Sequence, residues 1–458
     1  MGFFLGIDLG TSYFKSGIFD ENGNLKGLGH QLVKKEIGDG SICELPVSVF
    51  WNTLHVCVRE AVQKAGIMPG EIKSVSYSSQ ANSFILLDDN DEPLTPLILW
   101  PDKRAEGMDF PFKNFSDEDK FIKKTGLGIQ PNFEFAVAKI NWFQNKRPEL
   151  WKRVKSILSI SDYLTFCLTK QKVSDMSTLS MSGLLDITNL SLWDEALEFL
   201  ELSQNLFPSP KRMGSFVGNL NEQGADLIGL SPDTPYYLGG LDHHCAAIGS
   251  GIIQNNNICE STGTVLSCVG GSSLFNPGKN YSTAPGLFDG QYFQMAFDNN
   301  GALSLEWYQK NFASEYSIIE LLDMADKVVD ECEGLSAKPC ANNYPGLEGF
   351  VNIQSLHEHG HFVRALLEST SESLSNLVQT LKGNFYSGAV ISTGGGAQSQ
   401  LWIQIKANNL KTVFYIPECS ETACLGAALI GAASLKTTVD WDKFMNSWVR
   451  YKKSLRPD

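Results

Sequence analysis

The chain opens with a carboxylate placed directly before a glycine-threonine turn. Asp8-Leu9-Gly10-Thr11 ends an apolar run, and Ser12 and Lys15 come just after it. Glycine lets a backbone approach a phosphate closely, threonine adds a hydroxyl donor, and a carboxylate holds Mg²⁺ directly or through water. The segment is therefore a candidate phosphate and metal site, although an ordinary β-hairpin turn uses the same residue types.

A second turn of the same kind lies about half the chain further on, in Glu260-Ser261-Thr262-Gly263-Thr264. Two such turns at matching places in two halves would hold a polyphosphate from opposite sides, which is the positioning that phosphoryl transfer requires. The match also indicates a duplicated α/β domain with a cleft between the copies. Coincidence is the alternative, because Gly-Thr turns are common.

A further carboxylate, Asp242, follows Gly239-Gly240 and precedes His243-His244-Cys245. On a glycine-rich hinge it would be able to take the proton from an attacking hydroxyl group as a general base. Capping of a helix over Cys245–Gly249 is the structural alternative. A zinc site at His-His-Cys is disfavoured, because adjacent histidines rarely point at one ion.

A third glycine-rich segment lies near the end of the chain. Ala389–Thr393 is typical of a buried strand, and Gly394-Gly395-Gly396-Ala397 separates it from a helix predicted over Ser399–Asn409. This order favours nucleotide binding, since small residues admit a base or a phosphate to the helix N-terminus. A turn that needs glycine for its backbone angles is the alternative. The cluster His357–His361 is interpreted as the polar start of a helix over Phe362–Leu381 in preference to a metal site.

Hydrophobic periodicity predicts the elements that position these residues. A helix is expected over Val47–Ala65, ended by Gly66, and mostly helical structure from 115 to 207. Another helix, from Glu421, is expected to pack its small residues on the glycine loop at 394–397. Strands are predicted at Phe3–Asp8, Phe14–Phe19, Ile72–Ser78, Phe84–Leu87, Asn257–Ser261 and Val265–Val269.

Composition narrows the class of protein. The 458 residues suit two domains, and 37 basic against 51 acidic residues give a net charge of -14, which disfavours a nucleic-acid binder. No apolar run of membrane-spanning length occurs, and the N-terminus lacks the basic region of a signal peptide. The ten cysteines contain no C-x-x-C pair. Reduced thiols and a cytoplasmic location are therefore expected. There is also no dinucleotide fingerprint or P-loop.

These segments together resemble the FGGY carbohydrate kinases, a branch of the actin-like, sugar-kinase and Hsp70-type ATPase superfamily. Nearly the whole chain takes part. Further segments that carry the resemblance are Ser79–Ser83, Leu99–Ala105, Lys139–Phe143, Ser161–Leu164, Ser174-Asp175, Ser182–Asp186, Gly240–Asp242, Asn299–Gly301 and Gly394–Ser399 with Trp402.

The resemblance implies an α/β fold with two ribonuclease-H-like (actin-like ATPase) domains and a central cleft. We expect a sugar-binding and first phosphate domain over 1–241 and a nucleotide-binding domain over 242–458. ATP and Mg²⁺ are the implied cofactors, with Asp8 helping to place the metal ion and Asp242 as the catalytic base. The expected partners are a small-molecule sugar, no nucleic acid and no membrane, with a homodimer as an option.

The resemblance also implies roles residue by residue. The cofactor-binding residues would be Asp8, Gly10, Thr11, Ser12, Lys15, Thr262, Gly263, Thr264, Gly395, Gly396, Ala397 and Ser399. The substrate-binding residues would be Gln80, Ala81, Asn82, Asp102, Arg104, Asp242 and Asn299.

Departures from the family patterns leave the sugar open. Xylulose kinases carry Met-His-Gly where Ala81-Asn82-Ser83 stands, the Arg-Glu pair of glycerol kinases is absent, and Pro339–Gly349 is shorter than the family loop containing Gly-Glu-Arg, which would alter the nucleotide-side lid. A ketose such as a pentulose is the leading expectation, with a polyol, a hexulose or a heptulose as alternatives. From another class, a nucleotide-dependent chaperone or filament protein is the runner-up. A sugar sensor without activity ranks last, because Asp242 is present.

Overall fold

The computed structural model describes the chain except for residues 1, 39, 254–255, 329, 382–387 and 437. Its contacts divide the chain into two compact units. The first unit comprises Met1–Gly251, Ser273–Phe293 and Glu421–Val449, and the second comprises Ile252–Ser272, Gln294–Ser420 and Arg450–Asp458. The first division thus falls after Gly251, ten residues beyond the expected boundary after residue 241. Two later segments, Ser273–Phe293 and Glu421–Val449, also belong to the first unit.

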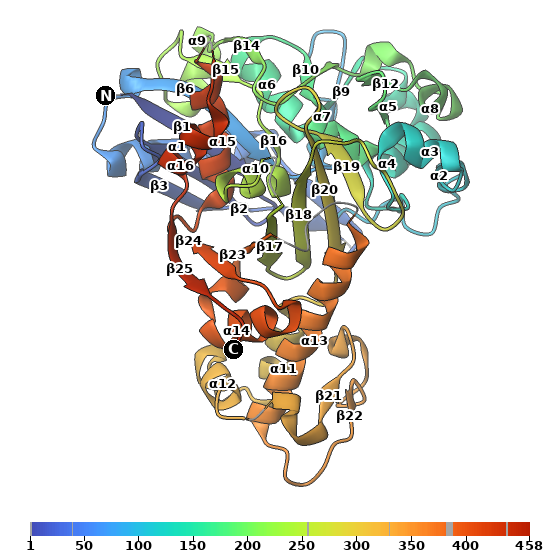
Figure 1. Ribbon diagram of the computed structural model, residues 1–458. Helices are drawn as coiled ribbons and strands as arrows, with labels where there is room; N and C mark the ends of the chain where they lie inside the picture. Colours follow the sequence, from blue (N-terminus) through green and yellow to red (C-terminus); the bar gives the residue numbers. More distant parts are fainter. Residues whose placement is uncertain (1, 39, 254–255, 329, 382–387, 437) are drawn as a thin grey trace. The chain divides into compact units, whose positions relative to one another are not determined.

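The first unit is built on a mixed sheet in the order β14-β15-β6-β1-β2-β3, with β16 also paired to β6 (Figure 1). β1, β2 and β3 run antiparallel, β6 is parallel to β1, and β15 is parallel to β6. The strands are β1 (Phe3–Leu9), β2 (Tyr13–Phe19), β3 (Leu25–Leu32), β6 (Ile72–Ser79), β14 (Phe216–Asn219), β15 (Pro235–Tyr237) and β16 (Gly240–Leu241). The predicted opening hairpin is confirmed.

The sheet of the second unit repeats this topology. β17 is antiparallel to β18 and parallel to β23, and β23 is parallel to β24. In the same way, β1 is antiparallel to β2 and parallel to β6, and β6 is parallel to β15. The strands are β17 (Ile258–Thr262), β18 (Leu266–Ser272), β20 (Tyr292–Asp298), β23 (Val390–Thr393), β24 (Phe414–Pro417) and β25 (Tyr451–Leu455). The duplication predicted from the two Gly-Thr turns therefore extends to the strand order.

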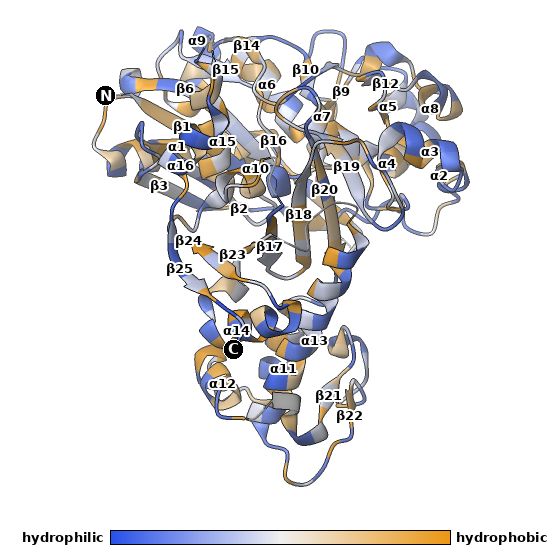
Figure 2. Ribbon diagram, viewed as in Figure 1, coloured by the Kyte–Doolittle hydropathy of each residue, from blue (hydrophilic) through white to orange (hydrophobic). Residues whose placement is uncertain are grey.

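The helix α1 (Val47–Ala65) has the predicted bounds, because Gly66 ends it in the left-handed conformation at φ 66°. Its buried face, which includes Phe50, Leu54 and Val58, packs in the core cluster that lines one side of the first sheet. The alternation of apolar and polar residues along one helix is visible in α13 (His359–Thr380), which is banded in Figure 2.

The small residues of the helix α15 (Thr422–Ser434) pack within the first unit, whereas the sequence predicted the glycine loop at 394–397 as their partner. The helix lies against β1, β6 and α10 (Asp242–Gly249) in the first unit. A Cβ atom on Gly6 would lie 1.9 Å from the carbonyl oxygen of Cys424, and one on Gly426 would lie 1.9 Å from that of Cys245. The small residues of α15 therefore serve close helix–strand and helix–helix packing.

Helices make up most of the regular structure from 115 to 207, as predicted, and the stretch also contains short strands. β9 pairs with β7 in a second, five-stranded sheet of the first unit, in the order β4-β5-β8-β7-β9. β7 was predicted from the sequence with its observed bounds, whereas the other four strands, which are two to four residues long, are too short to show a period in sequence. The five strands are β4 (Glu36–Gly38), β5 (Ile42–Leu45), β7 (Phe84–Leu87), β8 (Leu97–Ile98) and β9 (Ser156–Ser159).

The remaining elements complete the two units. In the first unit they are α2 (Phe112–Ser116), α3 (Asp119–Thr125), α4 (Ala136–Lys146), α5 (Pro148–Trp151), α6 (Ile160–Thr169), β10 (Val173–Asp175), α7 (Met176–Leu179), β11 (Leu185–Asp186), β12 (Ser191–Leu192), α8 (Asp194–Phe199), β13 (Ser209–Lys211), α9 (Glu222–Ile228), β19 (Ser282–Pro285) and α16 (Trp441–Trp448). In the second they are α11 (Leu303–Phe312), α12 (Ile318–Ala325), β21 (Ser336–Ala337), β22 (Phe350–Val351) and α14 (Gln400–Leu410). Within the described residues, no helix has the length and apolar character needed to span a bilayer.

Candidate active site

Asp8 and Asp242 are placed by three neighbouring parallel strand ends. In the pairing of β1 with β6, Asp8 lies opposite Ser78, and in the pairing of β6 with β16, Ser78 lies opposite Gly240. Asp242 then begins α10 two residues after Gly240. Parallel α/β sheets bind ligands at the carboxyl ends of their strands, so both carboxylates stand where a ligand would.

The environment of Asp8 disfavours its charge when no cation is bound. The hydroxyl of Ser78 donates to Asp8 Oδ1 at 2.8 Å. Burial raises the pKa of Asp8 to about 7 and the neighbouring carboxylate of Asp242 adds to the increase, while Ser78 and Lys15 act in the opposite direction. A divalent cation would relieve this repulsion, and carboxylate oxygens are the ligands that Mg²⁺ prefers. The residues therefore fit the metal role expected for Asp8.

Lys15 lies opposite Asp8 in the β1–β2 hairpin. Its Nζ atom donates to Oε2 of Glu421 at 2.7 Å. Glu421 is the residue immediately before α15. Although burial acts against it, the carboxylate of Glu421 raises the pKa of Lys15. Glu421 was missed as a site residue, because its partner lies 406 positions away and nothing local marks the pair.

The turn between β1 and β2 is fixed to the expected sugar-facing segment. Thr11 Oγ1 donates to Gln80 Oε1 at 3.1 Å and accepts the indole N–H of Trp100 at 2.7 Å. Ser83 Oγ donates to the same Gln80 oxygen, at 3.1 Å, and accepts the main-chain N–H of Trp100, at 2.9 Å. Gln80 is buried, so it joins the two segments, whereas Ser12 is exposed beside the turn. Trp100 was not singled out from the sequence.

Asn82 sits beside Ala81 in the left-handed conformation, at φ 60°, which asparagine tolerates better than most residues. Its Oδ1 atom accepts the N–H of Ala136 at 3.0 Å, and its Nδ2 atom donates to the carbonyl oxygen of Met181 at 3.3 Å. Both ends of the amide are thus used to join the segment to two other parts of the first unit. Ala81 and Asn82 remain half-buried.

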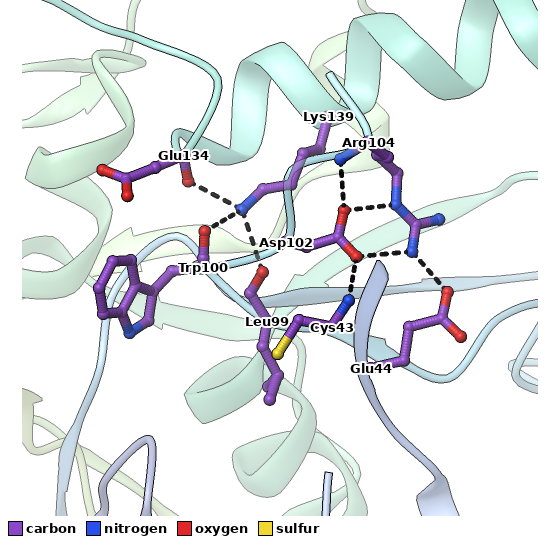
Figure 3. Close-up of polar contacts among 8 residues, drawn as sticks. All are labelled: Cys43, Glu44, Leu99, Trp100, Asp102, Arg104, Glu134 and Lys139. Atoms are coloured by element: carbon purple, nitrogen blue, oxygen red, sulfur yellow. Dashed lines mark hydrogen bonds and ion pairs between the residues drawn. The ribbon is translucent and has the colours of Figure 1, made fainter. Parts of the chain in front are cut away.

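Asp102 and Arg104 form a closed network instead of an open sugar contact (Figure 3). Asp102 is fully buried, and its two oxygens accept the main-chain N–H of Cys43 at 2.7 Å and three N–H groups of Arg104 at 2.7–3.0 Å. Arg104 Nη2 also donates to Glu44 Oε1 at 2.5 Å. This geometry does not support direct sugar contacts by Asp102 and Arg104. Their aspartate–arginine pattern shapes the loop that follows Trp100.

In the second unit, a buried ion pair lies beneath the turn between β17 and β18. Lys406 Nζ on α14 donates to Glu260 Oε1 at 2.9 Å and to Thr262 Oγ1 at 2.6 Å, and both charged side chains are fully buried. Thr262 Oγ1 also donates to Glu260 Oε2 at 2.8 Å, and Ser392 donates to Glu260. The hydroxyl of Thr262 is therefore engaged in the network, while Gly263 is half-buried and Thr264 exposed at the turn.

The glycine loop between β23 and α14 packs on the same turn. Gly394 has a φ of 76°, and a Cβ atom there would lie 2.9 Å from Ser261 Oγ. A Cβ atom on Gly396 would lie 2.7 Å from that of Thr262. The loop thus needs glycine both for its backbone angles and for close approach to the turn. The alternative given above, a turn that requires glycine for its backbone angles, therefore also applies to this loop.

A pocket of about 890 Å³ opens beside this loop within the second unit. Gly395, Gly396 and Ser399 line it, together with Trp402 at the start of α14 and Arg364 on α13. Ser399 also caps α14 by accepting the N–H of Trp402. Ala397 is buried. The volume lies in the range of small-molecule and cofactor sites.

The segment Asn299–Gly301 supports the second turn from another side. The N–H of Ala302 donates to the carbonyl oxygen of Gly263 at 2.7 Å, and a Cβ atom on Gly301 would lie 2.5 Å from the carbonyl oxygen of Thr264. Asn300 is buried and its amide donates to Ser369 and Ser373. Asn299 itself is exposed.

The histidines singled out in the sequence have local partners. His244 is buried, contacts Ser177 Oγ through Nδ1 at 2.8 Å, and stacks on Phe293. Burial lowers the pKa of His244 to about 3, so it is neutral. His357 and His361 each accept a main-chain N–H with Nδ1, from Gln354 and Glu358, as expected at a polar helix start.

Two aspartates of the expected family pattern are buried and have structural roles. Asp175 accepts the hydroxyl of Tyr77 at 2.8 Å and the N–H of Thr178 at 2.6 Å, and Asp162 forms a capping box with Ser159. Burial raises the pKa of Asp175 to about 7 and that of Asp162 to about 6. Both carboxyl groups thus bind protons more tightly in the folded state than in the unfolded chain.

Replacing Asp175 by asparagine should therefore flatten part of the pH dependence of stability. Between about pH 4 and pH 7 the folded protein holds a proton on Asp175 that the unfolded chain has lost, so wild-type stability falls as the pH rises through this window. Relative to the variant, wild type should lose about 2.5 kcal/mol between pH 5 and pH 8. Urea unfolding of both proteins at the two pH values measures the difference, and parallel profiles would contradict the assigned protonation.

The family models match both parts of the chain. The N-terminal domain of the FGGY family of carbohydrate kinases matches residues 3–249, and its C-terminal domain matches residues 335–435. The chain therefore belongs to the FGGY family of carbohydrate kinases, and it is an ATP-dependent phosphotransferase acting on a small carbohydrate. The chaperone or filament alternative is not favoured.

Relatives and solved structures agree with the family. A gluconokinase of Bacillus subtilis is 27% identical over 94% of this chain and 87% of its own length. A xylulose kinase of Staphylococcus epidermidis is 27% identical over 97% of this chain and 90% of its own length. The crystal structure of xylulose kinase from Rhodospirillum rubrum has a TM-score of 0.90 at 20% identity, covering 100% of this chain and 94% of that one. The gluconate kinase structure from Lactobacillus acidophilus has a TM-score of 0.87 at 22% identity, with the same coverage. The two-domain actin-like ATPase fold expected from the sequence is confirmed.

Proposed function

We propose that this kinase transfers the γ-phosphoryl group of ATP to a hydroxyl group of a small neutral sugar, a ketose such as a pentulose. The observation that carries the proposal is the register of Asp8, Ser78 and Gly240 across β1, β6 and β16, which puts Asp242 beside Asp8 at the strand ends. Asp242 is half-buried, so it can reach a ligand.

The two aspartates, the two turns and the glycine loop have separate roles in this proposal. Asp242 contacts the sugar and accepts the proton of the attacking hydroxyl group. Asp8 holds Mg²⁺, which when bound neutralises charge on the β- and γ-phosphates. Two turns bind phosphates, the first made of Gly10, Thr11 and Ser12 with Lys15 beside it, and the second of Thr262, Gly263 and Thr264. They do so through main-chain N–H groups, the ammonium group of Lys15 and the exposed hydroxyls of Ser12 and Thr264. Gly395, Gly396 and Ser399 bind the adenosine, and Ala397 is buried in the same loop.

The partners of the cationic side chains near the expected sugar site favour a neutral sugar over an aldonate. Arg104 is paired with Asp102 and Glu44, and Lys139 donates to three carbonyl oxygens. These cations of the first unit are thus already engaged, and a sugar carboxylate would have to compete for them. Gluconate is nevertheless the second candidate, because gluconokinases are among the relatives at the same level of identity as xylulose kinases.

The cysteines support a cytoplasmic location for the reaction, where ATP is available. No disulfide joins any two of the ten cysteines, and most of them are buried. Such thiols persist in reducing compartments. A homodimer stays an option for the assembly.

The proposal is tested by a coupled assay of ADP release over pentuloses, hexuloses, heptuloses, glycerol, erythritol and gluconate, each with ATP and Mg²⁺. The expected result is strong stimulation by one ketose, and by a pentulose in particular. Stimulation by gluconate alone would replace the ketose by the aldonate. No stimulation above the background of ATP hydrolysis by any of the compounds would contradict the proposed function.

A further inference from the structure

Lys139 on α4 is fully buried, and it is held by main-chain oxygens instead of a carboxylate. Its Nζ atom donates to the carbonyl oxygens of Leu99 at 3.1 Å, Trp100 at 2.9 Å and Glu134 at 2.8 Å. Figure 3 shows the ammonium group between these three carbonyls, next to the Asp102–Arg104 network. An ammonium group has three N–H donors, so the three acceptors use its whole donor capacity.

The three carbonyls belong to two segments that approach the expected sugar site. Leu99 and Trp100 follow β8, and the indole of Trp100 donates to Thr11 in the first phosphate turn. Glu134 lies two residues before Ala136, whose N–H donates to Asn82 Oδ1. The ammonium group of Lys139 therefore connects the segment that contains Trp100 to the segment that holds Asn82.

Burying a charged side chain costs free energy unless all of its hydrogen bonds are made. Removing a lysine ammonium from water carries a desolvation cost that only a full set of hydrogen bonds offsets. Shorter or neutral side chains cannot donate to three carbonyl oxygens at once. The presence of lysine at this position thus indicates that the spacing of the two segments matters.

We propose that Lys139 is a positioning residue for sugar binding, which keeps Trp100 and Asn82 at the separation that the sugar requires. The inference rests on the proposed function, since it assigns these segments to the sugar. Lys139 does not itself touch the sugar, because it is fully buried. Its effect is transmitted through the main chain at Trp100 and through the segment from Glu134 to Ala136.

Protonation gives the inference a second readout. Burial lowers the pKa of Lys139 to about 7, the carboxylates of Asp102 and Glu134 and the thiol of Cys43 act to raise it, and Arg104 acts to lower it. A neutral amine has two N–H donors for three carbonyl oxygens. The KM for the sugar should therefore rise with pH above about 7.

The test compares Lys139→Met with Lys406→Met. The two lysines are matched, since each is fully buried on a helix, one in each unit. We expect Lys139→Met to raise the KM for the sugar about tenfold or more and to change the KM for ATP less than about threefold. Lys406→Met should instead raise the KM for ATP and change the KM for the sugar little. The alkaline rise of the sugar KM should disappear in Lys139→Met.

A second variant keeps the inference testable if Lys139→Met does not fold. Trp100→Phe removes the N–H that reaches Thr11 together with one ring of the indole, and it should raise the sugar KM in the same direction. In the double variant the two effects should be less than additive, because both act on the same segment. Equal changes in both KM values, or an unchanged sugar KM with a lowered melting temperature, would overturn the inference. In that case wild-type activity on the sugar would still stand, whereas failure of the proposed function would appear as an inactive wild type.

Discussion

Replacing Asp242 by asparagine should lower kcat for the best sugar by about 10³-fold, with changes of less than about threefold in either KM. The amide has nearly the same shape as the carboxylate and can keep contact with a sugar hydroxyl. It cannot accept the proton that the attacking hydroxyl group loses. The loss should therefore fall on the chemical step. Initial rates over a grid of sugar and ATP concentrations separate the two effects.

The matched control is Asp194→Asn. Asp194 is the first residue of α8, as Asp242 is the first residue of α10, but it is exposed and belongs to no phosphate or sugar segment. This variant should keep wild-type kcat and KM. If Asp242→Asn also kept full activity on the best substrate, Asp242 would not be the base.

Replacing Lys406 by methionine should have the second largest effect. It leaves the carboxylate of Glu260 buried without its cation beneath the turn between β17 and β18, to which we assign phosphate binding. Breaking one partner of a buried pair costs about 3–5 kcal/mol. Because Lys406 also donates to Thr262, the turn should lose its shape and the KM for ATP should rise about tenfold. Thermal unfolding and ATP titration of activity measure the two effects.

A double variant distinguishes charge from packing. Glu260→Gln in the Lys406→Met background removes the unpaired charge and keeps the volume, so it should recover a large part of the lost stability. If the double variant were no more stable than Lys406→Met, the cost would come from lost packing. The buried ion pair would then not be what holds the turn.

Local signals in the sequence were sufficient for the elements that carry the site. Val47–Ala65 was predicted with the observed bounds, because its apolar period is regular and Gly66 is a strong C-terminal signal. The two Gly-Thr hairpins were found for a similar reason, since a turn between two apolar segments is encoded by adjacent residues. The match between them correctly predicted the repeated topology.

Other features depend on contacts that adjacent residues do not encode. Lys15 and Glu421 are 406 positions apart, and Lys406 and Glu260 are 146 apart. A lysine in an amphipathic pattern looks like a surface residue, so neither Lys139 nor Lys406 could be recognised as buried. Asp102 and Arg104 show the converse, because a charged pair beside a tryptophan suggests a ligand contact until its burial is known.

The short strands of the first unit show a further limit. Ser156–Ser159 contains only two apolar residues, and it becomes a strand because β7 offers a partner. Tertiary context decides such segments. The small residues of α15 were likewise recognised as packing residues, but the sequence did not reveal that β1 and α10 are their partners.

Phosphorus NMR of the complete reaction tests the central claim most directly. Wild-type enzyme, ATP, Mg²⁺ and the best sugar from the screen should yield one phosphate monoester of the sugar for each ADP formed, and the coupling pattern identifies the hydroxyl group that receives the phosphate. Asp242→Asn should yield neither product at a comparable rate. Formation of ADP with inorganic phosphate and no sugar phosphate would contradict the account.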